Sequence, residues 1–251
     1  MLAKQRLILI QQELKKKKFL SINELCEFLN VSKSTVQRDL DILEEDHKLI
    51  RERGGASLIN YQNISTLDEI SIMDKIALNV EEKKELCIAA ISEIEDGDTI
   101  FLDTGTTVSY ITDYIGKKNI NVITNSIFIV NKLSGDNINV FLLGGKYSNK
   151  YKMTYGLGAI EDLSKFRIDK SFISGTGISL KYDEVYGSDT EVAAIKKEVI
   201  KRSGKSYLLV DNTKFNFTGI SVFSNISEFE KVFTNKINNV PSKYNNIINC
   251  R

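Results

Sequence analysis

Short apolar runs alternate with helix-like segments along most of this chain, and this alternation restricts the fold more than any other feature of the sequence. From Asp98 onward the runs have the length of a buried strand, and segments with helical periodicity separate several of them. Continuous apolar strands of this kind are typical of parallel sheets covered by helices on both faces. We therefore predict a mostly parallel α/β domain. Its strands are expected at 99–102, 121–123, 140–143, 171–173, 207–210 and 232–234, and its helices at 108–115, 127–133 and 191–202.

Glycine usage divides the chain into two parts. None of the 15 glycines precedes Gly54, and thirteen lie between Gly97 and Gly219. Glycine marks turns between strands and helices. Because the first part lacks it, we expect that part to consist of helices joined by tight polar turns. We predict an N-terminal domain at 1–57, a linker at 58–80 with some helix near 73–78, and a C-terminal α/β domain at 81–251.

Composition excludes several classes of protein. The formal net charge is +1, so any nucleic-acid surface must be local. Three cysteines lie far apart with no CxxC, and the chain has one histidine, which argues against a zinc site and a disulfide framework. No apolar stretch approaches the length of a membrane span. We expect a cytoplasmic protein that binds no membrane and needs no cofactor.

The N-terminal part has the spacing of a helix-turn-helix. Ser21 can cap a helix with apolar residues on one face, and Asn30 ends that helix. Ser32 can cap the next helix, and an earlier helix at about 4–14 adds apolar residues to the same core. The buried stripe of the Ser32 helix is expected to consist of Val36, Leu40 and Leu43.

In a helix-turn-helix the start of the second helix faces the major groove. Here that start holds short hydroxyl residues, an amide and basic side chains, namely Ser32, Lys33, Ser34, Thr35, Gln37 and Arg38. Arg51 and Arg53 beside a Gly-Gly turn look like a wing that contacts the DNA backbone or minor groove. Residues 1–57 hold 11 Lys+Arg against 9 Asp+Glu. Because that charge is modest, a protein-interaction module remains an alternative to DNA binding.

Five predicted strands of the C-terminal part end in polar or glycine-rich clusters. These are Asp103-Thr104-Gly105-Thr106-Thr107, Thr124-Asn125-Ser126, Gly144-Gly145-Lys146, Ser174-Gly175-Thr176-Gly177 and Asp211-Asn212-Thr213-Lys214. Ligands of open parallel sheets bind beyond the carboxyl ends of the strands. If all five strands run parallel, the clusters converge on one ligand site.

The chemistry of these clusters suits a ligand with an anionic group and hydroxyls. Gly105 allows close approach of the backbone, and Thr106 and Thr107 lie at a predicted helix start, where free amides favour an anion. Lys214 can add a positive charge, and Asp103 and Asn125 can bind hydroxyls. Read singly, the Asp-x-Gly-Thr-Thr segment is also compatible with an ordinary strand-to-helix turn. It matches neither a P-loop nor GxGxxG.

A resemblance to a known family covers about residues 3–235. The stretch VSKSTVQRDLDILEEDHKLIRERGGA resembles the winged helix of DeoR-family bacterial transcriptional regulators, with Gln37 in place of the first arginine of the usual pair. The segments EEKKELCIAAISEIEDGDTIFLDTGTT, VITNSI, LLGG, IDKSFISGTGI and LLVDNTKF resemble the sensor domain of the same family.

The resemblance implies a sensor related in fold to ribose-5-phosphate isomerase. It also implies a phosphorylated sugar as effector and repression of a sugar-catabolic operon. Gly105, Thr106 and Thr107 would form the phosphate loop. The remaining ligand shell would be Asp103, Asn125, Ser126, Gly144, Gly145, Gly175 and Lys214. Because such regulators read paired half-sites in double-stranded operator DNA, we expect a homo-oligomer, a dimer or a tetramer.

The alternative is a sugar-phosphate isomerase or deaminase-like enzyme with a DNA-binding appendage. Such an enzyme needs a general base beside the reacting carbon. The candidates for this base and its partner are Asp183, Glu184, Asp189, Glu191, Asp211 and Lys214. No spacing in the sequence pairs two of them convincingly. The fused DNA-binding part favours a regulator that is not an enzyme.

Overall fold

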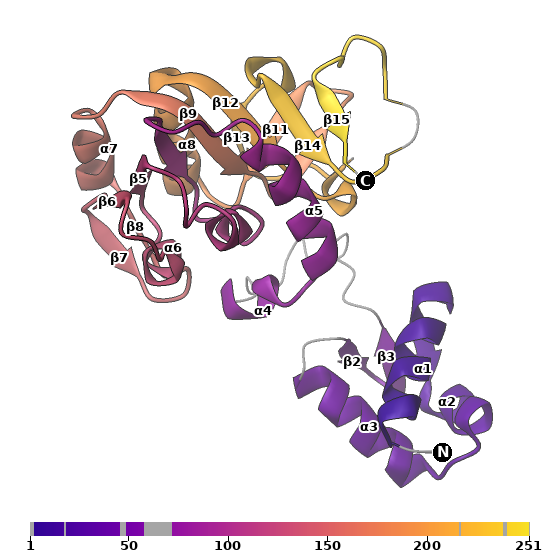
Figure 1. Cartoon of the computed structure of the whole chain (residues 1–251). Helices are drawn as coiled ribbons and strands as arrows, with labels where there is room; N and C mark the ends of the chain where they lie inside the picture. The colour runs from indigo at the N-terminus through magenta and orange to yellow at the C-terminus, as the bar shows by residue number, and fades with distance from the viewer. Residues whose placement is uncertain are drawn as a thin grey trace. The chain divides into compact units, whose positions relative to one another are not determined.

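The computed structural model describes residues 3–17, 19–45, 49–57, 72–215, 217–237 and 240–250. The chain divides into two compact units, Met1–Glu69 and Ile70–Arg251 (Figure 1). Most of the predicted linker, residues 58–71, lies outside the described residues, and the predicted domain boundaries stay a prediction. The predicted helix near 73–78 corresponds to α4 (Ile72–Ile76).

The N-terminal unit contains three helices and a small antiparallel sheet with the strand order β1-β3-β2. Ser21 and Glu24 form a reciprocal capping box at the start of α2, and Asn30 ends that helix in the left-handed conformation, φ 51°, as predicted. Strand β1 was not predicted. The elements are α1 (Ala3–Lys17), β1 (Phe19–Ser21), α2 (Ile22–Leu29), α3 (Lys33–Glu45), β2 (Ile50–Glu52) and β3 (Gly55–Ser57).

The core of the C-terminal unit is a seven-stranded sheet in the order β15-β14-β12-β9-β4-β5-β6. Every neighbouring pair is parallel, which confirms the predicted parallel sheet. β15 was not predicted. In chain order the strands are β4 (Thr99–Leu102), β5 (Ile120–Thr124), β6 (Ile138–Leu142), β9 (Ile168–Ser174), β12 (Ser203–Leu209), β14 (Lys231–Thr234) and β15 (Ile247–Asn249).

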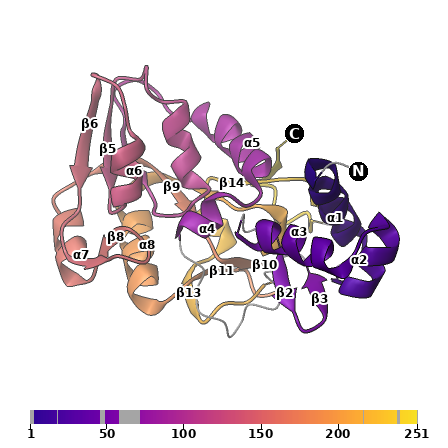
Figure 2. The same cartoon turned by 90° about the horizontal axis from the view of Figure 1, so that it is seen from below.

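Two hydrophobic clusters lie on opposite faces of this sheet. One face packs against α5 (Val80–Ile91), the 3-10 helix η2 (Val108–Asp113) and α6 (Ile127–Lys132). The other packs against α7 (Leu157–Leu163) and α8 (Thr190–Arg202). Figure 2 shows α5 on one side of the sheet and α7 and α8 on the other. The predicted helical cover of both faces is therefore confirmed.

The structure corrects one predicted helix and adds two small sheets. The predicted helix at 108–115 is the 3-10 helix η2, which is tighter and shorter than an α-helix. The additional strands are β7 (Lys146–Ser148), β8 (Met153–Tyr155), β10 (Gly177–Ser179), β11 (Glu184–Gly187) and β13 (Ser221–Ser224), and two further 3-10 turns are η3 (Asn212–Lys214) and η4 (Ile226–Glu228). Among the described helices, none is both long and apolar enough to cross a membrane.

Candidate functional site

The start of α3 presents an exposed polar surface. Val36, Leu40 and Leu43 are fully buried, so the packing of the helix fixes which of its faces is turned to solvent. The Thr35 amide donates to Ser32 Oγ at 3.4 Å, as expected of the predicted Ser32 cap. The predicted DNA-contacting residues on the exposed side are Ser32, Lys33, Ser34, Gln37 and Arg38, and Thr35 is half-buried. The structure brings these six residues together at the start of α3, on Ser32 just before the helix and on its first two turns.

The predicted wing is the hairpin β2–β3. Gly54 takes a positive φ of +87° at the turn, and a Cβ on Gly55 would lie 2.3 Å from the Leu20 carbonyl oxygen, so each glycine has its own steric reason. Arg53 is exposed beside this turn. Arg51 is held differently, because its Nη1 donates to Asp41 Oδ1 at 2.9 Å and to the Gln37 carbonyl at 3.3 Å. Arg51 therefore also braces the wing against α3.

The sequence analysis did not identify the ion pair that supports α3. Arg6 of α1 binds Asp39 with two hydrogen bonds, Nε to Oδ2 at 2.6 Å and Nη2 to Oδ1 at 2.9 Å. Asp39 is 2% exposed. A paired carboxylate on the buried side of α3 fixes that helix against α1.

The five strands with polar ends are neighbours in the sheet, in the order β12-β9-β4-β5-β6. Because they run parallel, their carboxyl ends lie along one edge of the sheet, which we call the carboxyl edge. The condition that the sequence analysis set for convergence is thus met. Whether these residues touch a ligand stays a prediction.

Asp103 lies at the centre of this edge, and neighbouring groups engage one of its carboxylate oxygens. Its Oδ2 accepts from Lys196 Nζ at 2.6 Å, from Ser174 Oγ at 2.7 Å and from the Ser174 amide at 3.0 Å. Burial raises the pKa of this carboxyl, but the Lys196 charge and the Ser174 hydrogen bonds outweigh that effect and hold its pKa below the ordinary value. Asp103 is therefore a charged anchor between β4, β9 and α8.

Packing alone requires glycine at position 105, whether or not a ligand binds there. A Cβ at this position would lie 1.8 Å from Ser174 Oγ and 2.6 Å from Ser174 Cβ. The amides of Gly105, Thr106 and Thr107 make no backbone hydrogen bond among the described residues. Because η2 is a short 3-10 helix, its dipole adds less than the predicted α-helix would. The loop offers amide donors in a tightly packed conformation.

Asn125 and Ser126 follow β5. Asn125 is 3% exposed, and its Nδ2 donates to the Thr154 carbonyl at 2.8 Å, while its Oδ1 has no partner among the described residues. Ser126 caps α6, because its Oγ accepts from the Ile129 amide at 3.2 Å. Of the two, only Asn125 has a buried acceptor left for a ligand.

The other three predicted site glycines also lie in crowded backbone. A Cβ on Gly145, which has φ +118°, would lie 2.5 Å from the Tyr155 carbonyl oxygen. The Gly144 amide donates to Asp162 Oδ2 at 2.8 Å. A Cβ on Gly175 would lie 3.1 Å from Val185 Cγ1. Close packing thus accounts for these glycines whether or not a ligand lies beside them.

Two lysines, Lys214 and Lys83, belong to the β12 end of the carboxyl edge. Lys214 Nζ lies 3.7 Å from Asp211 Oδ2, and Asp211 caps η3. The sequence analysis did not identify Lys83 on α5, which is 5% exposed and donates to the Lys75 carbonyl at 2.5 Å. Burial lowers the pKa of Lys83 to about 8, Asp211 opposes that shift, and Lys214 adds to it.

Cys87 shows that this face of α5 is turned to the predicted phosphate loop. Its Sγ donates to the Thr107 carbonyl at 3.1 Å. Lys83 lies one helical turn before Cys87 and therefore on the same face. Among the described residues no carboxylate lies within ion-pair distance of Lys83, so this buried ammonium has a carbonyl oxygen and no anionic group as its partner.

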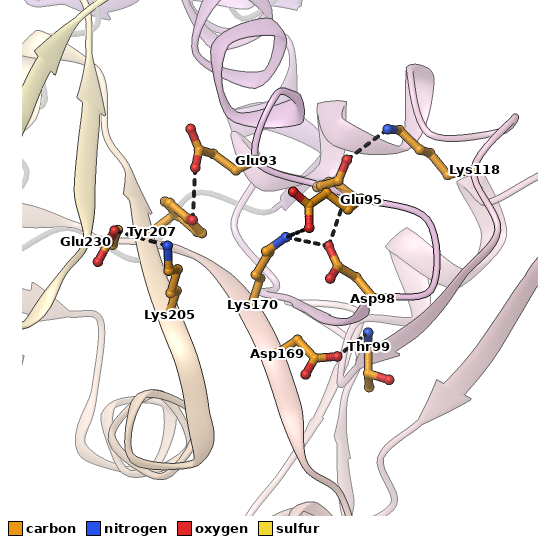
Figure 3. A network of polar contacts seen from close by, with 11 residues as sticks. Glu93, Glu95, Asp98, Thr99, Lys118, Asp169, Lys170, Lys205, Tyr207 and Glu230 are labelled. Atoms are coloured by element: carbon orange, nitrogen blue, oxygen red, sulfur yellow. Dashed lines mark hydrogen bonds and ion pairs between the residues drawn. The ribbon is translucent and has the colours of Figure 1, made fainter.

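The opposite edge of the sheet is different, because its charges are satisfied within the chain. Figure 3 shows this amino edge, where Lys170 binds Asp98 at 2.8 Å and Glu95 at 3.2 Å, and the Tyr207 hydroxyl donates to Glu93 at 3.0 Å. By contrast, three buried polar atoms at the ends of β5 and β14 have no partner among the described residues, namely Asn125 Oδ1, Thr234 Oγ1 and Asn235 Oδ1. Unpartnered buried polar groups at the carboxyl edge are compatible with a polar ligand there, which stays a prediction.

Lys83 and Lys196 share a signal that was present in the sequence. Both occupy positions of an otherwise apolar helical stripe, Lys83 with Leu86, Cys87 and Ala90, and Lys196 with Val192 and Val199. A lysine at such a position is buried and needs a partner.

Two of the acidic residues considered for catalysis have structural roles. Asp189 caps α8, and Glu184 accepts a hydrogen bond from the Tyr186 hydroxyl at 2.5 Å.

Two protein families match this chain. The family described as DeoR-like helix-turn-helix domain matches residues 6–62, and the family described as DeoR C terminal sensor domain matches residues 78–236. Together they cover both units.

Curated relatives span nearly the whole chain. The HTH-type transcriptional repressor GlcR of Bacillus subtilis is 32% identical over 95% of this chain and 91% of its own length. The lactose phosphotransferase system repressor of Streptococcus mutans is 33% identical over 98% of both chains, and that of Lactococcus lactis is 36% identical over 85% and 83%. These relatives are named as repressors and not as enzymes, which supports the prediction of a regulator.

Among solved structures, ribose 5-phosphate isomerase A from Methanocaldococcus jannaschii is 16% identical, covers 55% of each chain and has a TM-score of 0.41. Ribose 5-phosphate isomerase from Plasmodium falciparum is 22% identical, covers 56% and 55%, and has a TM-score of 0.40. A likeness at that level says nothing about a ligand or a reaction.

Proposed function

Because this chain belongs to the DeoR family of DNA-binding transcriptional regulators, we propose that it represses a sugar-catabolic operon under the control of a phosphorylated sugar. The effector would bind at the carboxyl edge of the C-terminal sheet, and the operator would bind at α3 and the wing. Because operator DNA lies in the cytoplasm of a bacterium, this function implies a cytoplasmic location.

In the DNA-binding part, the exposed residues at the start of α3 would enter the major groove. Gln37 has both a donor and an acceptor that can read a base edge, while Ser32, Lys33, Ser34, Thr35 and Arg38 suit phosphates. Arg53 would contact the backbone from the wing tip. Arg51, which is bound to Asp41, would hold the wing at its angle to α3 and reach the DNA from there.

One observation carries the effector proposal. Lys83 is a buried ammonium that forms no ion pair with a carboxylate in the described part of the chain. It lies on the face of α5 whose Cys87 contacts the carbonyl of Thr107 in the loop of Gly105, Thr106 and Thr107. An anionic group on that loop would give Lys83 and the free loop amides their missing partner. We therefore add Lys83 to the predicted phosphate-binding residues, beside Lys214.

Unphosphorylated parts of the effector would meet polar atoms farther along the edge. Asn125 Oδ1 is a buried acceptor suited to a sugar hydroxyl. Asp103, which is held by Lys196 and Ser174, would position the loop and meet the ligand only with its second oxygen. Ser126, Gly144, Gly145 and Gly175 would shape the site mainly through their backbone.

The names of two relatives point to sugar uptake, since both are lactose phosphotransferase system repressors. The test is to titrate a panel of pentose and hexose phosphates, with the matching free sugars and inorganic phosphate as controls. One phosphorylated sugar should raise the melting temperature and change operator affinity, and operator should change effector affinity by the same factor.

Lys83→Met should weaken that effector without weakening operator binding in its absence. Lys84→Met is the matched control, because Lys84 is the next residue and already pairs with a carboxylate, that of Glu81. If no sugar phosphate alters either the melting temperature or operator affinity, the sensing half of the proposal is wrong, while the DNA-binding half stands on the operator titration alone.

A further inference from the structure

Strand β6 forms an edge of the parallel sheet and exposes large apolar side chains. Val140 is 38% exposed, Phe141 42% and Leu142 44%. Figure 1 shows β6 at the end of its unit, with β7 and α7 close by. Those neighbours add Tyr147 at 45% and Leu157 at 78% exposed. Exposed apolar side chains that gather on one end of a domain mark an interaction surface.

The strand lacks the devices that usually protect a sheet edge. Ile138–Leu142 reads INVFL, with no charged residue and no proline. Soluble proteins normally place lysine, proline or a bulge on an exposed edge to prevent pairing with another chain. An apolar, uncharged edge of five residues is therefore suited to pairing.

Most outward hydrogen-bonding groups of the β6 backbone have no partner in the part of the chain that the structure describes. The Ile120 amide donates to the Asn137 carbonyl and the Leu143 amide to the Thr124 carbonyl, so odd-numbered residues face β5. The even-numbered residues consequently direct their amides and carbonyls away from the sheet. Ile138 uses its amide in a long bond to the Gly135 carbonyl at 3.5 Å. The outward groups of Val140 and Leu142 and the Ile138 carbonyl have no partner among the described residues.

We propose that β6 is the interface with a second copy of this chain, paired antiparallel about a two-fold axis at Val140. In that register Val140 faces Val140 of the other copy, and Ile138 faces Leu142. The two Val140 residues exchange a pair of backbone hydrogen bonds, and each Leu142 amide donates to the Ile138 carbonyl of the other copy. Every unpaired outward group named above except the Leu142 carbonyl is satisfied. The side chains that face each other at the hydrogen-bonded positions, Val140 with Val140 and Ile138 with Leu142, are apolar.

A second copy suits this edge better than an unrelated partner. The strand is complementary to itself in register and carries no charge that would select a different chain. Helix-turn-helix regulators read two half-sites related by a two-fold axis, so a two-fold interface is needed elsewhere in the chain. Because one strand pair is smaller than a stable interface, β7 and α7 would extend the contact through Tyr147 and Leu157.

The first test is the mass of the full chain in solution, measured by sedimentation across a range of concentrations. Val140→Lys should halve the mass and lower affinity for a two-half-site operator to that for one half-site, with unchanged secondary structure. Ile220→Lys is the matched control, because Ile220 is 91% exposed on another part of the unit and should leave the mass unchanged. A wild-type monomer, or a Val140→Lys variant with the wild-type mass, overturns the proposal.

The second test introduces no charge into the proposed interface. In the proposed register the two Val140 Cα atoms lie about 5.5 Å apart, within the range that a disulfide can join. Val140→Cys should cross-link to a dimer on mild oxidation well above the background from Cys26 and Cys250 in the parent chain. Asn139→Cys faces position 141 of the other copy and should cross-link much less. Equal cross-linking at 139 and 140, or none above the parent at 140, contradicts the register.

Discussion

Lys196 Nζ lies 2.6 Å from Asp103 Oδ2 and 2.7 Å from the Ser174 carbonyl oxygen, so one buried ammonium joins α8 to β4 and β9 at the predicted phosphate loop. Both side chains are almost completely buried. Ser174 completes the arrangement by donating its amide and hydroxyl to the same carboxylate oxygen. The loop therefore begins from a rigid charged anchor.

Removing Lys196 should destabilise the C-terminal unit strongly. Lys196→Met leaves the Asp103 carboxylate buried without its counter-charge, and breaking such a pair costs about 3–5 kcal/mol. Urea unfolding of the full chain measures the loss in free energy. Lys197→Met, one residue away and exposed, should change stability by less than about 0.5 kcal/mol. A Lys196→Met variant as stable as Lys197→Met would mean that Asp103 is neutral in the folded protein.

Gly105→Ala should reshape the loop, because the added Cβ would lie 1.8 Å from Ser174 Oγ. We expect effector affinity to fall by at least about tenfold, which is about 1.4 kcal/mol. Calorimetric titration of the effector measures this. Gly187→Ala is the control, since the nearest atom to its Cβ would be at 3.6 Å. Ser174→Gly removes the clashing side chain and should restore part of the affinity of Gly105→Ala, whereas no rescue would place the fault outside this contact.

Lys83 predicts a pH dependence of effector binding. Burial lowers the pKa of Lys83 to about 8 in the free protein, and an adjacent phosphate would raise it. Affinity should thus begin to fall between pH 7 and 8 and fall steadily above pH 8, because binding must then reprotonate the lysine. Titrations from pH 7 to 9.5 test this in a range where the phosphate charge is constant. Lys83→Met should abolish the fall, and a wild-type affinity that rises above pH 8 would remove Lys83 from the site.

The same lysine makes stability depend on pH in the opposite direction. Above pH 8 the folded chain has lost the Lys83 proton, while the unfolded chain keeps it up to the ordinary pKa of 10.5. The unfolded state then binds more protons, so the Lys83 contribution to stability rises with pH between about 8 and 10.5. Comparing urea unfolding of wild type and Lys83→Met across this window isolates the effect. A difference between the two proteins that does not vary with pH would show an unshifted pKa.

Arg38→Ala should weaken operator binding and reduce its dependence on salt. Each lost phosphate contact lowers the slope of log affinity against log salt by about one unit. Lys16→Ala is a control for the change in net charge, because Lys16 is exposed on α1 and pairs with Glu13. An Arg38→Ala variant whose operator binding stays intact and does not depend on salt would favour the protein-interaction alternative for this helix.

Local signals in the sequence were sufficient for much of the fold. The Ser21 cap, the Asn30 stop and six of the seven strands of the parallel sheet follow from patterns a few residues long. The type of η2 and the strands β1 and β15 did not follow, because their formation depends on neighbours distant in the sequence. The Asp39–Arg6 and Asp103–Lys196 pairs join residues 33 and 93 positions apart, beyond the reach of any periodicity.

By itself the sequence determined the two-part organisation, the helix-turn-helix and a row of strand ends rich in glycine and hydroxyl residues, since these depend on local propensity and on hydrophobic period. Tertiary structure decided which of those strand ends are neighbours, where the lysines lie, and which glycines serve packing. The physical reason is burial. A lysine in a helical stripe is unremarkable along the chain, and becomes a charge in need of a partner only when Lys83 or Lys196 is enclosed by the sheet and its loops.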